Sequence, residues 1–327
     1  MTGKEVVRAS LYFRTPDRYA FDFPERYGSD FYSCGMSPSP DDRASNSVDE
    51  WGCVWSTKTN TLLGEVHEHP LKSWDDLSTL KIPDFMEDRR WEKMKSARAE
   101  AGDKYLMSYI CSIYERLHFL RGLEDLWCDI IENPDKVGFL IGVIVDRNIE
   151  AINRYADLGT DGIMIGDDWG LQNRLMISPE HWRAIWKPAY TRIFAAAHER
   201  GMDCWMHSCG YIVDILGDLI EVGLNAVHMD QQENMGLENL RDRFRGKINF
   251  FSCVDIQQTF ARGSPGEIRA YTRKMAECLG TKAGGFIPRW YTDPVGAGHK
   301  EENITIMCDE FIKINKEVYG TDLPVKT

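Results

Sequence analysis

An imidazole and a thiol two residues apart, His207 and Cys209, are the side chains of this sequence best placed to do chemistry. They follow a short apolar run that we predict to be a buried strand, and Gly210 then turns the chain into an amphipathic stretch over 211–222. Residues i and i+2 of a strand point to the same face, so the two side chains would lie together. Such a pair can form half of a zinc site. The alternative is a purely structural pair, because cysteine is among the most buried residues of proteins.

The remaining ligands of such a site stay open. Zinc takes three or four protein ligands, and a catalytic site leaves one position for substrate or water. Cys253 is the natural third candidate, since it ends a predicted strand further along the chain; its alternative is a buried, inert thiol. The carboxylates of Asp168, Asp230 or Glu233 could bind the metal instead, or could orient His207.

Short apolar runs alternate with helical patterns from about residue 74 onward. Strands are expected immediately before His207 and at 105–112, 162–165, 226–230, 248–254 and 285–287. Helices are expected at 87–102, 123–132, 134–158, 178–200, 211–222, 236–245, 265–280 and 300–319. Such strands indicate a parallel sheet with helices outside, and their number and spacing predict a (β/α)8 TIM barrel. No Gly-x-Gly-x-x-Gly follows the first strand, which argues against a dinucleotide-binding sheet. We expect a single domain over residues 1–327.

Residues 1–70 are predicted to be an irregular extension of that barrel. The stretch 14–60 is rich in proline, aspartate, serine and aromatic residues and shows no long periodic segment. Its aromatic side chains need to be buried somewhere. We therefore expect the extension to cover the barrel mouth, the alternative being a loosely packed appendage.

Polar side chains follow most of the predicted strands, where the active sites of such barrels lie. Six groups occur: Tyr114 and Glu115; Asp167 and Asp168; His207 and Cys209; Asp230, Gln232 and Glu233; Cys253 and Asp255; and Arg289 to Asp293. Core packing does not explain polar residues at so many strand ends, although the paired aspartates could simply cap a loop. We predict catalytic roles for Asp168, Asp230 and Glu233. Substrate contacts are predicted for Tyr114, Trp169, Arg289 and Tyr291.

The composition excludes several classes of protein. A net charge of −12, from 39 basic and 51 acidic residues, argues against nucleic acid as a partner, because phosphate binding needs clustered lysine and arginine. Nine cysteines without a repeated spacing favour reduced thiols in the cytosol. No apolar run reaches membrane-spanning length, and Met1–Ser10 shows no targeting pattern. We expect a cytoplasmic protein that binds neither nucleic acid nor a membrane.

Several motifs together resemble the uroporphyrinogen decarboxylase superfamily. They are Ile165-Gly166-Asp167-Asp168-Trp169-Gly170, Ile177-Ser178-Pro179-Glu180 with Trp182 and Lys187-Pro188, His207-Ser208-Cys209-Gly210, Asp255-Ile256-Gln257, Gly284-Gly285-Phe286-Ile287 and Glu302-Asn303. The resemblance runs from about Pro16 to the predicted C-terminal helix. It implies a (β/α)8 barrel with its site at the C-terminal mouth.

His207 and Cys209 resemble the zinc-binding His-x-Cys pair of the corrinoid-dependent methyltransferases in that superfamily. The resemblance implies a zinc enzyme that moves a methyl group from a small methylated donor, such as a methoxylated aromatic compound, to a corrinoid (cobalamin). The chain has no Asp-x-His-x-x-Gly cobalamin-binding motif, so the implied partner is a separate corrinoid protein. Those relatives carry a distant cysteine after the last strand, where this chain has Pro288-Arg289-Trp290-Tyr291.

Two other functions remain open from the sequence. One is a metal-free decarboxylase of an acidic, porphyrinogen-like substrate, as in the true decarboxylases of the superfamily. Arg14 and Arg18 are present near the N-terminus, but without the arginine-rich segment of that branch. The other is a non-catalytic protein that uses the same barrel to bind a tetrapyrrole or a methyl carrier. A homodimer is a further expectation for each of these functions.

Overall fold

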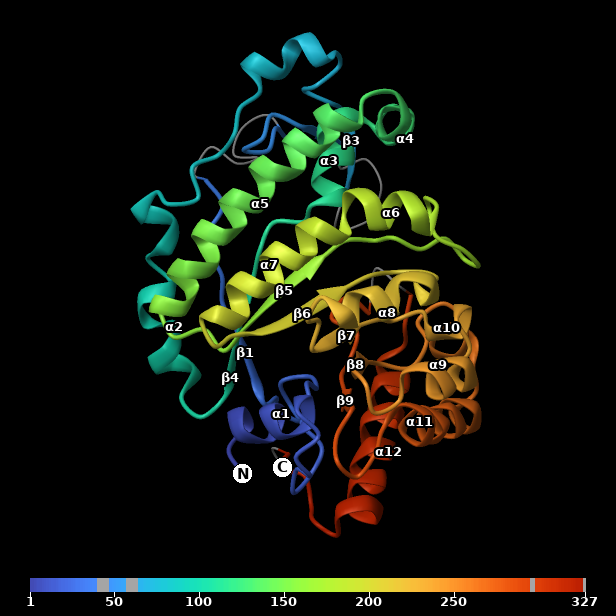
Figure 1. Ribbon diagram of the computed structural model, residues 1–327. Coiled ribbons are helices and arrows are strands. Elements are labelled where there is room, and N and C mark those ends of the chain that lie inside the picture. Colours follow the sequence, from blue (N-terminus) through green and yellow to red (C-terminus); the bar gives the residue numbers. More distant parts are fainter. Residues whose placement is uncertain (40–46, 57–63, 295–297, 326–327) are drawn as a thin grey trace.

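A curled parallel sheet of seven strands forms the centre of the protein (Figure 1). The computed structural model describes residues 1–39, 47–56, 64–294 and 298–325. The strands lie in the order β1-β4-β5-β6-β7-β8-β9. Their bounds are β1 (Phe31–Ser33), β4 (Tyr105–Tyr109), β5 (Gly162–Gly166), β6 (Asp203–His207), β7 (Ala226–His228), β8 (Asn249–Ser252) and β9 (Phe286–Pro288).

The strands from β4 to β9 are buried along nearly their whole length, as continuous apolar runs predict. Large side chains from alternate positions fill the inside of the curled sheet, among them Tyr105 and Trp205, whose ring centroids lie 5.7 Å apart. Gly162 leaves room for them, because a Cβ there would lie 2.1 Å from the Tyr105 hydroxyl oxygen. The interior is therefore a packed core rather than a channel.

Helices cover the outside of the sheet (Figure 1). They are α2 (Met94–Ala101), α3 (Tyr114–Arg121), α4 (Leu123–Glu132), α5 (Pro134–Asp157), α6 (Pro179–Ile185), α7 (Lys187–Glu199), α8 (Val213–Glu221), α9 (Leu237–Phe244), α10 (Thr259–Arg262), α11 (Pro265–Leu279) and α12 (Glu301–Tyr319). The Ser178 and Ser264 side chains cap α6 and α11, and each helix then begins with proline. Within the described ranges, no helix is long and apolar enough to cross a membrane.

A helix that the sequence did not predict, α1 (Gly3–Leu11), lies under the N-terminal ends of the strands, at the bottom of Figure 1. Its backbone begins beside β4, where Lys4 N donates a hydrogen bond to Asp103 O (2.9 Å). Val6, Val7 and Leu11 pack onto the side chains inside the sheet. The helix therefore closes the end of the barrel opposite the predicted site, and the irregular extension expected over 1–70 begins only after it.

Beyond α1, the described part of the N-terminal stretch is largely irregular. Apart from β1, it contains the antiparallel pair β2 (Val54–Ser56) and β3 (Glu65–Glu68) and, further on, the 3-10 helices η1 (Trp74–Thr79) and η2 (Asp88–Trp91). Trp51 is buried, with the Arg116 guanidinium of α3 over its ring at 5.3 Å. This part of the stretch packs on α3, whose first residues lie at the mouth.

The sheet does not close into the complete eight-stranded barrel that the sequence predicted. Its edges are β1 and β9, and Asp22 makes a single parallel bridge near them. Asp22 N donates to Pro288 O (3.0 Å), and Trp290 N donates to Asp22 O (2.9 Å). Proline cannot donate to a strand ladder, and Pro24 follows Asp22 closely. A full eighth strand is therefore absent from the described residues, although the predicted curled, parallel α/β architecture is confirmed.

Candidate metal centre

The mouth of the barrel brings His207, Cys209 and Asp168 together. His207 is the last residue of β6, Cys209 follows it, and Asp168 lies in the loop after β5. Cys209 Sγ is 3.3 Å from His207 Nε2, and Asp168 Oδ1 is 3.5 Å from the same nitrogen. The three potential ligand atoms lie within 4.8 Å of one another. Nitrogen, sulfur and carboxylate oxygen at such a spacing form a donor set that zinc accepts.

Hydrogen bonds hold the loops after β5 and β6 against each other. Cys209 N donates to Asp168 Oδ1 (2.8 Å), and Gly170 N donates to Cys209 O (3.1 Å). Gly210 has a φ of 71°, and a Cβ there would lie 2.2 Å from Gly170 O. Only glycine fits this contact, because it needs both a left-handed conformation and the missing side chain. The residue after Cys209 thus fixes the distance between the two loops.

His228, which we did not predict, lies directly beside His207. It ends β7, and the register of β6 and β7 places His207 opposite it. The two Nδ1 atoms are 3.1 Å apart, and His228 Nε2 is 3.1 Å from Asp230 Oδ2. Burial and the Arg289 charge lower the pKa of His228 to about 3, so its ring is neutral. The signal was in the sequence, since His228 and Asp230 are two residues apart on a strand, as His207 and Cys209 are.

Asp230, a predicted catalytic residue, forms a buried ion pair with Arg289. Arg289 Nη1 donates to both Asp230 oxygens, at 3.0 and 3.2 Å, and also contacts His228 Nε2. Burial alone would raise the pKa of Asp230, but His228 and Arg289 outweigh it and hold that pKa well below its ordinary value. The Cys253 thiol donates to Asp230 Oδ1 at 3.2 Å. Cys253 therefore lies beside Asp230 and is not part of the group formed by His207, Cys209 and Asp168.

Negative charge gathers around this group. Burial raises the pKa of Cys209 far above its usual value, and the Asp168 and Asp230 carboxylates raise it further. Burial, followed by the charges of Asp168 and Asp167, raises the pKa of Glu115 to about 8. Throughout the described residues, no lysine or arginine forms an ion pair with Asp168 or Glu115. A bound cation would supply the missing positive charge and favour the thiolate.

Asp167 points away from the group and fixes the start of α3. Its carboxylate accepts hydrogen bonds from Ile113 N (3.1 Å), Glu115 N (3.0 Å) and the Tyr190 hydroxyl (2.8 Å). The side chain is fully buried, and burial raises its pKa to about 7. Asp167 thus holds the first turn of α3 at the mouth, whereas its neighbour Asp168 faces the potential ligands.

The four predicted substrate contacts lie in different surroundings. Tyr114 and Trp169 stack on each other with ring centroids 4.1 Å apart and are 1% and 0% exposed, so they belong to the packed core. Arg289 is occupied by Asp230. Tyr291 remains partly exposed, and burial together with the negative charges of Asp230 and Cys209 raises its pKa. Of the four, Tyr291 is the residue with accessible surface beside the candidate metal centre.

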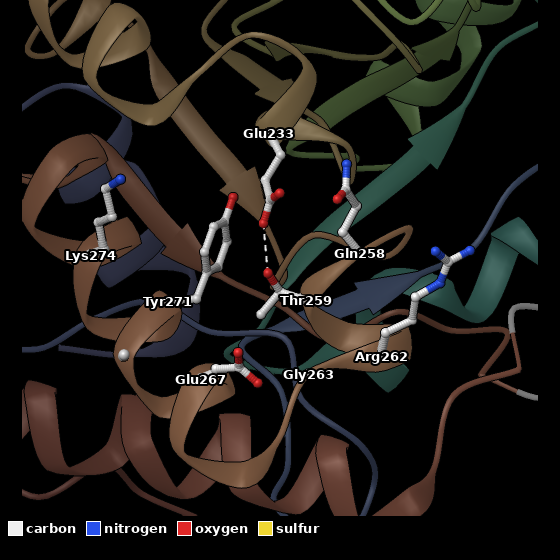
Figure 2. A pocket seen from close by; sticks show the side chains of 9 residues that line it. Glu233, Gln258, Thr259, Arg262, Gly263, Glu267, Tyr271 and Lys274 are labelled. Carbon is white, nitrogen blue, oxygen red and sulfur yellow. Dashed lines mark hydrogen bonds between the residues drawn. The ribbon is translucent and has the colours of Figure 1, made fainter.

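Glu233 lines a cavity of about 500 Å³ between η3 (Gln232–Asn234), α10 and α11 (Figure 2). The Thr259 hydroxyl donates to Glu233 Oε1 at 2.6 Å, and the Tyr271 ring lies beside this pair. The cavity is lined by Glu233, Gln258, Thr259, Arg262, Gly263, Glu267, Ala270, Tyr271 and Lys274. His207, Cys209 and Asp168 are not among them, so the structure places the predicted catalytic Glu233 apart from the candidate metal centre.

The fold is similar to that of known enzymes. A methyltransferase from Methanosarcina mazei superposes with a TM-score of 0.67 at 15% identity, over 96% of this chain and 99% of the other. Two weaker likenesses, each with a TM-score of 0.42 and 12% identity, carry no argument. They are a D-psicose 3-epimerase in the presence of D-fructose (70% of this chain, 84% of the other) and the IolI protein with a bound zinc atom (74% and 87%). Identities this low show the fold alone.

Sequence comparison gives the family. No curated protein matches the chain at a significant level. The pattern of the family described as uroporphyrinogen decarboxylase (URO-D), however, matches residues 50–307, which is most of the chain. The match spans the loops that carry Asp168, His207, Cys209 and Asp230, together with the mouth of the barrel. The chain therefore belongs to the uroporphyrinogen decarboxylase family.

Proposed function

We propose that this protein is a zinc-dependent methyltransferase that moves a methyl group from a small methylated donor to a corrinoid carried by a separate protein. A methoxylated aromatic compound is the donor class we favour. The observation that supports the proposal most is the group of His207 Nε2, Cys209 Sγ and Asp168 Oδ1 within 4.8 Å of one another. Membership of the family and the fold shared with a methyltransferase from Methanosarcina mazei agree with it.

The residues at the mouth fit a zinc ion. Three protein ligands of these types leave a coordination position for a substrate, as catalytic zinc requires. Cys209 must lose its proton to bind, and the charge of the ion would favour that loss in a site where the carboxylates oppose it. Cys253 would have to break its hydrogen bond to Asp230 in order to bind. Asp168 is therefore the third ligand that we propose.

When bound, zinc acts as a Lewis acid that stabilises negative charge on the oxygen from which the methyl group departs. The chain itself holds the ligands in place. The Cys209 amide orients the Asp168 carboxylate, and Gly210 allows the two loops to approach. Tyr291 is the side chain that we propose to contact the donor, because it is partly exposed and its pKa responds to Cys209.

The carrier protein would approach the end of the barrel that bears the site. Helix α1 covers the opposite end, where Val6, Val7 and Leu11 fill the interior. The loops after β5, β6 and β7 surround the candidate metal centre, so a cofactor brought by a partner has to reach this side. The absence of a cobalamin-binding motif in the sequence is the reason to place the corrinoid on a partner.

A metal-free decarboxylase is the second function that the family suggests. Binding the carboxylates of an acidic substrate needs arginine side chains that are free to pair with them. Arg289 is 5% exposed and pairs with Asp230. Arg18 is also buried, and its guanidinium donates to both oxygens of Asp30 at 2.7 Å. Both arginines are therefore occupied, and the methyltransferase is the better supported function.

Methyl transfer to free cob(I)alamin tests the proposal. We expect the zinc-loaded protein to convert a methoxylated aromatic donor to the phenol while methylcobalamin forms, a change followed by absorbance. Chelation and Cys209→Ser should both abolish the transfer. Cys204→Ala removes a thiol on the outer face of the same strand and should leave it intact.

Three other outcomes would contradict the proposal. Transfer that persists after zinc removal would exclude a role for the metal. Carbon dioxide released from an acidic substrate by the chelated protein would favour the decarboxylase. Tight binding of cobalamin without any product would favour the non-catalytic carrier-binding protein.

A further inference from the structure

The hydrogen bonds around His207 decide which of its nitrogens a metal ion can use. Nε2 faces the Cys209 sulfur at 3.3 Å and the Asp168 carboxylate at 3.5 Å, whereas Nδ1 faces His228 Nδ1 at 3.1 Å. A ring nitrogen binds a metal ion only when it carries no proton. A neutral His207 must therefore hold its proton on Nδ1 in order to offer Nε2.

One proton fits between the two facing Nδ1 atoms, because two protons would repel and none would leave two lone pairs opposed. When His207 carries that proton, His228 Nδ1 accepts the hydrogen bond. The neutral ring of His228 then has its own proton on Nε2, and Asp230 Oδ2, 3.1 Å away, accepts it. The carboxylate of Asp230 therefore favours the arrangement of protons that leaves His207 Nε2 free.

We infer that His228 and Asp230 form a relay that orients His207 and keeps its Nε2 available to a metal ion. Both are positioning residues, because they act through His207. Histidines that bind metals commonly donate their second N–H to a carboxylate or a carbonyl group. Here a second histidine stands between the two groups. The inference rests on the proposed zinc site and specifies how the chain prepares its nitrogen ligand.

Arg289 and Phe251 hold the relay in place. The Arg289 guanidinium pairs with Asp230 and lies 5.2 Å above the Phe251 ring, and the His228 ring centroid is 5.4 Å from the same ring. The side chains of Asp230 and Arg289 are 3% and 6% exposed, and that of His228 is 15% exposed. Water is nearly excluded, so protein groups set the direction of each hydrogen bond.

Arg289 also explains why the carboxylate is needed. Its Nη1 contacts His228 Nε2. If it donated a proton there, the order of protons would reverse, and His207 Nε2 would be blocked. Asp230 engages Arg289 with both oxygens and so competes for that donor. In the relay both nitrogens of His228 have protein partners, which separates this role from the alternative in which His228 is itself a ligand.

Zinc affinity measured by competition with a chromophoric chelator tests the relay in the full-length protein. His228→Leu removes the acceptor for His207 and should weaken zinc binding about 10–100-fold. His228→Asn places an amide oxygen near the position of Nδ1 and should restore most of the affinity. His118→Leu removes another partly buried histidine, on α3, and should leave the affinity unchanged.

The tautomers of the unmutated protein give a second measurement that does not depend on variants folding. In zinc-loaded protein labelled with 15N-histidine, we expect a proton on His207 Nδ1 and on His228 Nε2, with His228 Nδ1 free. A proton on His228 Nδ1, or zinc bound to a His228 nitrogen, would overturn the relay. Parent-like zinc affinity in a folded His228→Leu would also overturn it while leaving the proposed function intact. A parent protein that binds no zinc would instead overturn the proposed function, and the relay with it.

Discussion

The two ends of the barrel both carry acidic strand residues, but only one end neutralises them. At the foot, the N-terminal end, Asp161 pairs with Lys4 Nζ (2.5 Å) and Arg98 Nη1 (2.7 Å). Asp203 lies 3.5 Å from Arg8 Nε and accepts hydrogen bonds from two tyrosine hydroxyls. The foot cluster (Lys4, Arg8, Arg98, Asp161 and Asp203) thus matches its buried carboxylates with cations.

The mouth cluster (Glu115, Asp168, His207 and Cys209) is organised differently. It combines two carboxyl groups with an imidazole and a thiol, and no lysine or arginine in the described part of the chain forms an ion pair with either acid. The pKa values of Glu115 and Cys209 are raised as a result of burial and of that uncompensated charge. The comparison teaches that charge left uncompensated by the protein, rather than acidity as such, marks the place for a ligand.

Removing a thiol from the mouth should have the largest effect. We expect Cys209→Ser to lose zinc during gel filtration, because serine cannot replace the thiolate ligand. Cys204→Ala, on the same strand, should retain it. Metal analysis of both proteins gives the answer, and retention of a full zinc complement by folded Cys209→Ser would break the distinction between the two ends.

A methyl group at the loop contact should be the next most damaging change. Gly210→Ala forces a left-handed residue to carry a Cβ 2.2 Å from Gly170 O and should lower the free energy of unfolding by about 2–3 kcal/mol. Gly201→Ala is the matched control, since Gly201 has a φ of 72° but a Cβ there would meet no atom of the described residues within 4 Å. Equal losses in urea unfolding of the two variants would show that the loop contact contributes nothing.

Exchanging one aspartate at each end should separate stability from metal binding. Asp161→Asn weakens the ion pairs with Lys4 and Arg98 and should cost about 1–3 kcal/mol, with zinc affinity unchanged. Asp168→Asn should do the reverse, because its amide oxygen still accepts from Cys209 N but is a poorer zinc ligand. Chemical unfolding and chelator competition on both variants test this. Loss of stability in both, with zinc binding intact, would contradict it.

The smallest expected effect is a pH dependence confined to the mouth. The pKa of Glu115 rises from 4.5 to about 8 on folding, so the folded, metal-free protein binds a proton that the unfolded chain releases. Its stability should therefore fall as pH rises between these two values and level off above them. Glu115→Gln should remove this fall. A difference in melting temperature between parent and variant that does not change with pH would contradict the assignment.

Much of the fold follows from sequence patterns that depend on near neighbours. The apolar runs predicted β4 to β9 to within a few residues, because strands buried on both faces need continuous apolar sequence. One helix predicted over 178–200 is in fact α6 and α7, which separate just before Pro188. Helix α1 and the incomplete closure of the sheet were not predicted. Both depend on contacts with distant residues, such as those of Val6 inside the sheet and of Asp22 with β9.

The site shows the same division. His207 and Cys209 were found because side chains two apart on a strand share a face, and that rule would also have found His228 and Asp230. Which of two adjacent acids faces the mouth was a matter of packing: Asp167 caps α3, and Asp168 lies at the ligands. The burial of Tyr114 against Trp169 and the separate cavity of Glu233 depend on where α3 and α11 pack. No spacing rule reports that.

Zinc analysis of the protein purified without chelator tests the central proposal most directly. The site at the mouth should hold about one zinc ion per chain, as a single set of three protein ligands implies. His207→Ala should hold none, and Asp161→Asn, altered at the foot, should hold as much as the parent. A well-folded parent that contains no zinc, and takes up none on addition of the ion, would contradict a metal centre at this mouth.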